Sequence, residues 1–523
     1  MTALGIGAWP ARGDDPARDR AGVYLAAIVV AAAVAYAAAL IALGGNPLLA
    51  LPLLAALVTL AILARPVVGV YLLVGAAVLL EQWAIAGLDP LTAQTHFFEN
   101  LSGFSDVPIR LSACDLLALL TVGSWALRRA VGANAPVRGG PFAWGVAAYA
   151  AAFLVGTVIG FARGGKWDPI ATLAEARGPF YLCLLYFLTA NLVRTRAQLL
   201  GLLVEFVVLV GMKGFQALGN YAQMLGGPER LEAVTGHEDV VFFDATITLL
   251  LVMVILGVRG RLFYLLLALQ PVIIAAELVT TRRVAFAALA AALGVVALTS
   301  ALERPRTTFK ILGIAVVVFG IYTAVFWDQT GILAEPARVM REVVDPQSIS
   351  ERDRSSNVWR DIENANIAYT VRQLPLTGVG LGQEYLFQRE PPRIPSTFTY
   401  WRLTAHNAVL WTWLKAGPLG AFAFWFLVTQ VVVFGLQLYR RLDEPMLKAI
   451  AALPVLLTVA QVVYSSFDLG LTYNRTMIVL GMALGLTALL AKWSASARRD
   501  APYGSAAKWF FTRMPYGDSG VPS

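Results

Sequence analysis

The feature that most constrains this chain is the division of its sequence into apolar runs about as long as a membrane-spanning helix. The first clear run, Val23 to Leu43, contains no charged residue, and a helix needs roughly 20 apolar residues to cross a bilayer. Of the 523 residues, 14% are charged, against about 25% in a typical soluble domain. No small-residue cleavage site closes the first run, so we interpret it as an uncleaved helix rather than a signal peptide.

The runs predict an all-α fold, a polytopic transmembrane helical bundle of about 12–14 spans with one large, partly helical loop on the outer face. The expected organisation is a cytoplasmic tail (1–22), transmembrane helices (23–327), the loop (328–404), an outer-face helix with the last three spans (405–491) and a cytoplasmic tail (492–523). The expected spans are 23–43, 47–64, 66–82, 110–128, 142–162, 169–193, 198–219, 241–258, 262–280, 284–301, 309–327, 417–438, 446–466 and 471–491.

The formal net charge of +8 is spread in short clusters between the apolar runs, without a basic patch interleaved with aromatic residues. We therefore expect no nucleic-acid partner and take the charges as a topology signal. The positive-inside rule places both termini and the short basic loops in the cytoplasm, and the loop 328–404 outside. The residues of these loops are Arg128, Arg129, Arg138, Arg194, Arg196, Arg259, Arg261, Arg304, Arg306, Arg440 and Arg441.

A second set of ionisable residues lies within or at the ends of predicted spans, toward the predicted outer side. Each costs roughly 2.5–3.5 kcal/mol at the centre of a membrane helix. A structural ion pair, such as Glu277 with Arg282, explains one such residue but not the group, whose excess positive charge predicts a site for an anionic, lipid-borne substrate. Its members are Arg177, Lys213, Asp244, Glu277, Arg282, Arg283 and Arg475.

The loop contains an amphipathic segment, with apolar residues at helical spacing from Val358 to Tyr369, which Pro375 ends. Ser355, Ser356 and Asn357 are the expected N-caps, which would place Arg354 at a helix N-terminus, where an anion is favoured. The glycine-rich run 375–382 lacks the Lys and Ser/Thr of a phosphate-binding loop, so a tightly packed turn is the better interpretation.

The loop ends at the segment 400–407, which includes Arg402, Thr404 and His406. Thr404 is the expected N-cap of the next helix, so His406 would lie in its first turn, where the helix terminus lowers a histidine pKa and favours the neutral imidazole. We expect His406 to be functional. The other histidines, His96 and His237, lie in short outer loops without comparable neighbours. Cys114 and Cys183 do not have metal-binding spacing.

The sequence resembles the O-antigen ligase and polymerase superfamily in three places. A loop pattern of arginine, tryptophan, proline and a Gly-x-Gly-x-Gly run is followed by a His-Asn helix start with a Gly-x-x-Gly break. A Ser-Arg pair at an earlier span end is matched approximately by Thr281-Arg282, with Arg283 where the family prefers glycine. The other matching residues are Arg354, Trp359, Pro375, Gly378, Gly380, Gly382, His406, Asn407, Gly417 and Gly420.

The resemblance implies a metal-independent, inverting glycosyltransferase without a cofactor, in the bacterial inner membrane. The donor would be a glycan on a polyprenyl diphosphate and the acceptor a glycan or lipid-linked sugar, both used at the outer face among membrane lipids. The resemblance implies catalytic roles for Arg282, Arg354 and His406. We add Arg283, Asn407 and Arg402 as substrate-binding candidates, and Arg177 and Lys213 from the topology.

The sequence leaves several alternatives open. A ligase and a polymerase share the donor and differ in the acceptor, and either Arg282 or Arg283 could fill the family's arginine position. A transporter of a small anion or lipid-linked substrate would place its site near the bilayer midplane. A scaffold protein would tolerate replacement of His406 and Arg354.

Overall fold

The computed structural model describes residues 35–36, 50–80, 96–104, 108–132, 136–226, 234–390 and 400–499. The chain divides into two compact units, Met1–Arg65 and Pro66–Ser523. The first unit contains helix α2 (Ala50–Ala64). The predicted span 23–43 falls outside the described residues except for Ala35 and Tyr36.

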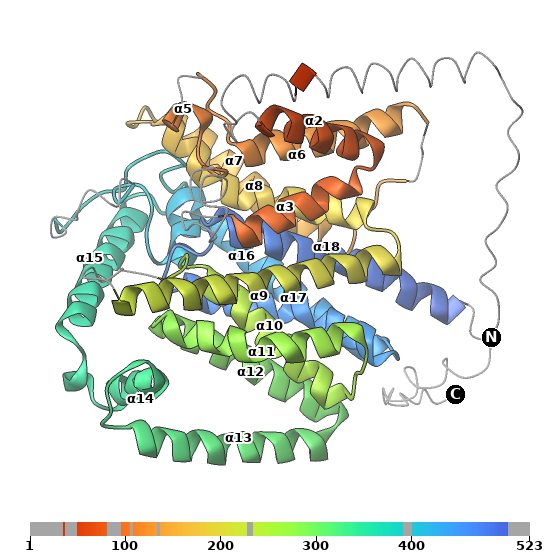
Figure 1. The fold of residues 1–523 in the computed structure, drawn as a ribbon. Helices are drawn as coiled ribbons and strands as arrows, with labels where there is room; N and C mark the ends of the chain where they lie inside the picture. Colours follow the sequence, from red (N-terminus) through yellow and green to blue (C-terminus); the bar gives the residue numbers. More distant parts are fainter. Residues whose placement is uncertain are drawn as a thin grey trace, which may run out of the picture. The chain divides into compact units, whose positions relative to one another are not determined.

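The second unit confirms the all-α prediction, since its described residues contain helices and only isolated β-bridges (Figure 1). The helices are α3 (Val67–Leu79), α5 (Leu101–Phe104), α6 (Ala113–Ala130), α7 (Ala143–Ala162), α8 (Pro169–Leu192), α9 (Arg196–Gly226), α10 (Asp239–Leu256), α11 (Arg261–Val279), α12 (Arg283–Glu303), α13 (Pro305–Phe326), η2 (Ile332–Ala334), α14 (Glu335–Val344), η3 (Pro346–Ser348), α15 (Glu351–Gln373), α16 (Ala408–Arg441), α17 (Pro445–Ser465) and α18 (Asn474–Arg499).

Nine of the helices in the described residues are long and apolar enough to cross a membrane: α7, α9 to α13 and α16 to α18. The chain is therefore an integral membrane protein. The helices α6 and α8, which were also predicted to be spans, are long enough but less apolar than these nine. The predicted span 66–82 is instead α3, whose 13 residues cover only about 20 Å and cannot cross a bilayer alone.

The centre of the second unit is formed by α10, α17 and α18, which are buried along most of their length. Two glycines bring α18 close to α8. A Cβ on Gly481 would lie 2.6 Å from the carbonyl oxygen of Leu182, and one on Gly485 would lie 2.7 Å from that of Tyr186. Small residues allow this close backbone approach, which is the usual basis of helix packing in membranes.

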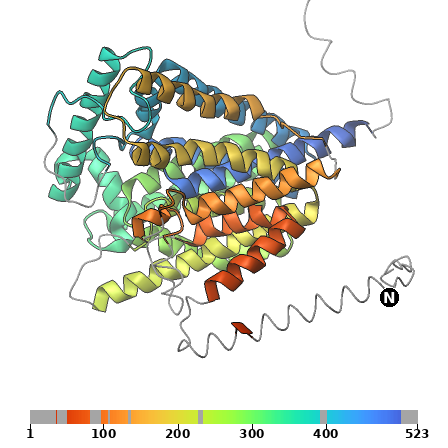
Figure 2. The same ribbon diagram turned by 90° about the horizontal axis from the view of Figure 1, so that it is seen from above.

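Short connections reverse the chain between successive long helices, so the connections gather at two ends of the bundle (Figures 1 and 2). At one end, Arg196 pairs with Glu444, and Lys448 pairs with Glu303 at 2.6 Å. The predicted basic loops lie at this end, which we call the basic end. The segment between α13 and α16 lies at the opposite end, which we call the loop end.

The long helix α16 is broken at Gly417, whose φ of 62° is left-handed. Because Pro418 has no N–H, the carbonyl of Leu414 loses its helical partner. The glycine-rich run replaces it: the Val379 N–H donates to the Leu414 carbonyl at 2.7 Å, and the Gly380 N–H donates to that of Lys415 at 3.0 Å. The interpretation of this run as a tightly packed turn is confirmed, since these N–H groups bind protein oxygens.

Candidate functional site

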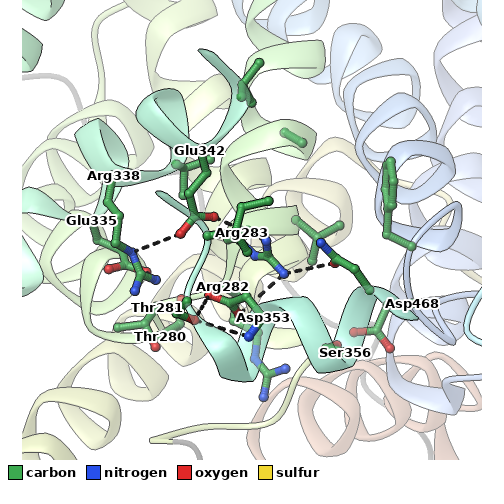
Figure 3. A pocket seen from close by; sticks show the side chains of 18 of the residues that line it. Thr280, Thr281, Arg282, Arg283, Glu335, Arg338, Glu342, Asp353, Ser356 and Asp468 are labelled. Atoms are coloured by element: carbon green, nitrogen blue, oxygen red, sulfur yellow. Dashed lines mark hydrogen bonds and ion pairs between the residues drawn. The ribbon is translucent and has the colours of Figure 1, made fainter. Parts of the chain in front are cut away.

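A cavity of about 550 Å³ lies at the loop end of the second unit, within the size range of small-molecule sites. It is bounded by the α11–α12 turn, by α14, by the first turns of α15 and by the α17–α18 turn (Figure 3). Four short segments from distant parts of the sequence therefore form one site.

The α11–α12 turn carries backbone strain next to two arginines. Thr281 has a φ of 51°, an unusual value for a β-branched residue, which costs on the order of 1–3 kcal/mol. Arg282 is the N-cap residue of α12 and Arg283 is its first residue. Strain of this kind persists where the surrounding structure enforces it, often at functional sites.

Two of the cavity's four arginines are neutralised by acidic neighbours. Arg283 contacts Glu342 at 3.2 Å and Asp353 at 3.4 Å. Arg338 pairs with Glu335 and lies 3.7 Å from Glu342. These pairs join α12, α14 and α15 and form one wall of the cavity (Figure 3).

The guanidinium groups of Arg282 and Arg360 have no ion pair or hydrogen bond with any described residue, although both line the cavity. The Nε atom of Arg360 is buried without a hydrogen-bond partner there. An unmatched guanidinium fork suits phosphate oxygens. Of the two adjacent arginines predicted from the sequence, Arg282 is therefore the one able to bind an added anion, whereas Arg283 is already paired.

Arg354 does not have the predicted position. The N-cap of α15 is Ser350, whose Oγ accepts a hydrogen bond from the Asp353 N–H at 3.2 Å, so the helix begins at Glu351. The predicted caps at 355–357 are wrong because this Ser-x-x-Asp box lies upstream. The Arg354 side chain is 54% exposed and pairs with Glu351 at 3.4 Å; it does not line the cavity, and Arg360 does.

His406 lies before α16 rather than in its first turn. Asn407, not Thr404, is the N-cap, and its side chain accepts a hydrogen bond from the Leu410 N–H at 3.0 Å. The His406 N–H donates to Glu363 at 2.7 Å, and the ring Nδ1 lies 3.2 Å from the same carboxylate. Asn407 therefore has a capping role in addition to the role predicted for it.

The predicted lowering of the His406 pKa is also wrong. Burial alone would lower the pKa of His406, but the hydrogen bond and the negative charge of Glu363 raise it above its ordinary value. An imidazole whose Nδ1 is held by a carboxylate acts through Nε2. His406 is not part of the cavity lining, but it is close enough to Asp468 and Arg360, which are, for their charges to act on it.

Sequence reasoning missed Arg360, Glu363, Asp468 and His237. The Nδ1 atom of His237 lies 3.9 Å from Oδ2 of Asp468, which lines the cavity. In sequence, Asp468 is far from His237, so this pair could not be inferred. Glu363 could have been suspected, because it continues the face of α15 that carries Asp353 and Arg360.

Arg177 and Lys213 have structural partners instead of facing the cavity. Arg177 is buried and pairs with Asp115 at 2.7 Å, joining α8 to α6. Lys213 is also buried, donates to Gln216 at 2.7 Å and lies 3.8 Å from Asp239. Neither residue lines the cavity.

Arg402 lies on the surface of the loop, where it is 49% exposed. Its guanidinium group is 4.7 Å from the ring centre of Trp401 and 3.7 Å from the carboxylate of Glu384. This residue also lies outside the cavity lining. Of the predicted site residues, the structure therefore brings together Arg282, Arg283 and, beside the cavity, His406.

Within the described ranges, no group of three or more His, Cys, Asp or Glu side chains is arranged to hold a metal ion. No protein-family model matches the chain, and no curated protein matches its sequence.

Proposed function

We propose that this protein is a membrane glycosyltransferase of the O-antigen ligase or polymerase type. It would transfer or polymerise a glycan from a polyprenyl-diphosphate donor, at the outer face of the bacterial inner membrane. The observation that carries the proposal is the pair of arginines, Arg282 and Arg360, that line one cavity and form no ion pair with any described residue. Two phosphate groups of a diphosphate match two unoccupied guanidinium forks.

The shape of the site suits a lipid-linked donor. The cavity lining also includes apolar residues, among them Val284, Ala287 and Val343. Val343 is 73% exposed, so this wall continues onto the surface of α14. The neighbouring span α13 has no buried residue in its most apolar stretch and forms an edge of the bundle (Figure 1). A polyprenyl chain in the membrane could reach the cavity along this side.

The chemistry follows from the charges. The bond between the anomeric carbon and the diphosphate oxygen breaks as an acceptor hydroxyl attacks, and negative charge develops on the leaving diphosphate. Arg282 and Arg360 would stabilise that charge. His406, held by Glu363, would take part in proton transfer or in stabilising the same charge. Attack from the face opposite the diphosphate inverts the anomeric configuration.

The basic end would face the cytoplasm under the positive-inside rule, which would put the cavity on the outer side. Lipid-linked glycans are available to an enzyme on that side without a nucleotide sugar. A transporter would place its site near the bilayer midplane, whereas this cavity lies at one end of the bundle.

The test is glycan transfer by purified protein in lipid nanodiscs from a polyprenyl-diphosphate-linked glycan, with EDTA present. Wild type and His96→Ala should transfer. The second protein is the control, because His96 is exposed and pairs with a close neighbour in sequence, Glu99, at 2.9 Å, and it does not line the cavity. Arg282→Ala and His406→Ala should lose most transfer while remaining folded. Equal activity of all four proteins would show that the assigned site is wrong. An inert wild type with glycan and lipid-linked acceptors would refute the enzyme and make uptake into proteoliposomes the next assay.

A further inference from the structure

A second histidine lies beside the cavity. His237 precedes Glu238, the N-cap residue of α10, and its Nδ1 is 3.9 Å from Oδ2 of Asp468, a residue of the cavity wall. The His237 side chain is 45% exposed, so a ligand in this region can reach it. The cavity is therefore flanked by two histidine–carboxylate pairs, His237 with Asp468 and His406 with Glu363.

Asp468 is held rigidly in the turn between α17 and α18. Its Oδ1 accepts hydrogen bonds from the Leu469 N–H at 2.7 Å and the Tyr473 hydroxyl at 3.0 Å. Its Oδ2 accepts one from the Tyr464 hydroxyl at 3.2 Å. A carboxylate with several donors remains charged and keeps its orientation, so it can orient a neighbouring imidazole.

The two histidines have opposite electrostatic surroundings. The charged groups that act on His237 are Asp468 from the α17–α18 turn, Arg282 from the α11–α12 turn, His406 from the start of α16 and Arg360 from α15. Partial burial and then the positive charge of Arg282 are the main causes that lower the pKa of His237 to about 4. His237 is therefore neutral at pH 7 and able to accept a proton. The raised pKa of His406 favours its protonated form.

We propose that His237 is the general base of the transfer reaction, and that protonated His406 acts with Arg282 and Arg360 on the leaving diphosphate. The inference rests on the glycosyl transfer proposed above. The acceptor O–H gives its proton to the imidazole of His237 as the oxygen forms its bond to the anomeric carbon. The bond from that carbon to the diphosphate breaks, and its electron pair stays on the diphosphate oxygen. His237 then releases the proton to solvent.

This arrangement links the base to the donor. The positive charges of Arg282 and Arg360 contribute to the low pKa of His237. A bound diphosphate neutralises these charges, so the pKa of His237 should rise toward its ordinary value. A base is more effective when its pKa approaches the working pH, so His237 becomes a better base once the donor is in place.

The experiment is the pH dependence of transfer by the full-length protein in nanodiscs, with the lipid-linked donor, for wild type, His237→Gln, His406→Gln and the control His96→Gln. The wild-type rate should rise as the pH increases through the pKa of His237. The pH at which kcat/KM for the donor rises reports the pKa of His237 in the free enzyme, and the pH at which kcat rises reports its pKa in the donor complex. The rise in kcat should therefore occur at higher pH than the rise in kcat/KM. His237→Gln should lower kcat by about 10²–10⁴-fold and remove this rise.

Two variants test the other histidine. In the wild type, deprotonation of His406 should make the transfer rate fall at high pH. His406→Gln should lose this fall and keep the rise of the rate at low pH. Glu363→Gln removes the charge that raises the pKa of His406, so the fall should move to lower pH. His96→Gln should match wild type throughout.

The outcomes separate the inference from the proposed function. Transfer by wild type together with an unchanged rate and pH profile in His237→Gln would overturn the role of His237 and leave the enzyme standing. An inert wild type would overturn both. If His237→Gln does not fold, the wild-type profile decides, because a rate that does not rise with pH in kcat or in kcat/KM rules out a base with a lowered pKa.

Discussion

Arg360→Ala should remove one of the two cavity-lining guanidinium groups that form no ion pair within the described part of the chain, whereas Arg354→Ala removes an exposed guanidinium from the same helix. The two variants lose the same chemical group from α15. They differ in where that group points, because Arg360 lines the cavity and Arg354 does not. The comparison therefore tests the cavity against the sequence resemblance, which favours Arg354.

The expected sizes follow from the environments of the two side chains. Removing a donor that is aimed at developing negative charge typically costs about 10²–10³-fold in kcat, or about 2.7–4 kcal/mol, and we expect this loss for Arg360→Ala. Arg354 is 54% exposed and its partner Glu351 is 86% exposed. Exposed pairs of this kind contribute about 0–1 kcal/mol to stability, so Arg354→Ala should leave transfer almost unchanged.

The Arg360→Ala substitution should lower the transfer activity without lowering the stability of the protein. The Nε atom of Arg360 is buried without a partner among the described residues, and an unsatisfied buried donor costs about 1–3 kcal/mol. Replacing Arg360 removes that cost, so the Tm of the Arg360→Ala protein should stay level or rise although its transfer activity is lost. A residue that is retained despite such a cost is typical of a functional site.

The assay is initial-rate glycan transfer in nanodiscs at saturating donor, with thermal unfolding of the same preparations. Loss of transfer in Arg354→Ala, with normal transfer in Arg360→Ala, would refute the assignment of the cavity and support the position given by the resemblance. Loss of transfer in both, with an unchanged Tm, would require the diphosphate to extend along α15 beyond the cavity.

Three further changes test the architecture that holds the site. Glu175→Gln should destabilise the protein by about 3–5 kcal/mol, because it leaves Lys415, 3.1 Å away and fully buried, without its charge partner; denaturant unfolding measures the loss. Gly160→Ala should lower the stability by about 1–3 kcal/mol or more, because the added Cβ would lie 2.2 Å from the Val379 carbonyl oxygen in the glycine-rich run. The control Gly294→Ala, in α12, places its Cβ with no atom within 4 Å and should raise the stability by about 1 kcal/mol. Thermal unfolding compares the two variants. Thr281→Gly should raise stability by about 1 kcal/mol, because glycine adopts the positive φ of this position without strain, and an unchanged Tm would argue against the strained turn.

The sequence predicted the spans well because their signal is local. A run of apolar residues must be helical in a bilayer, since every backbone polar group has to be satisfied within the segment. The basic connections before α9 and before α17 lie at one end of the bundle, where Arg196 pairs with Glu444. Where the prediction was wrong, as for the short helix α3, the expected span 66–82 was longer than the helix, which begins after Pro66 and ends at Leu79.

The helix α15 shows why an amphipathic pattern can mislead. Its apolar positions predicted a buried face that includes Val358, but that side chain is 48% exposed. Most of the buried face is polar: Glu363, Asn366 and Thr370 are each at most 1% exposed, as is the apolar Ile367. Their side chains bind the backbone of the loop that follows, as Asn366 does with the N–H of Arg389 at 2.9 Å. A helix that organises an irregular loop must bury polar groups to satisfy its backbone, and hydrophobic periodicity does not reveal that.

The site itself depends on contacts between residues far apart in the sequence. Two of its positions have local signatures: Arg282 closes a span, and His406 precedes one. Their partners do not, because Glu363 and Asp468 acquire meaning only when the α15 helix and the α17–α18 turn are placed beside them. The balance of charge in the cavity arises in the same way. Arg283 looks equivalent to Arg282 in sequence, yet the carboxylates of α14 and α15 pair with Arg283, and this difference is the reason why the proposed donor site uses Arg282.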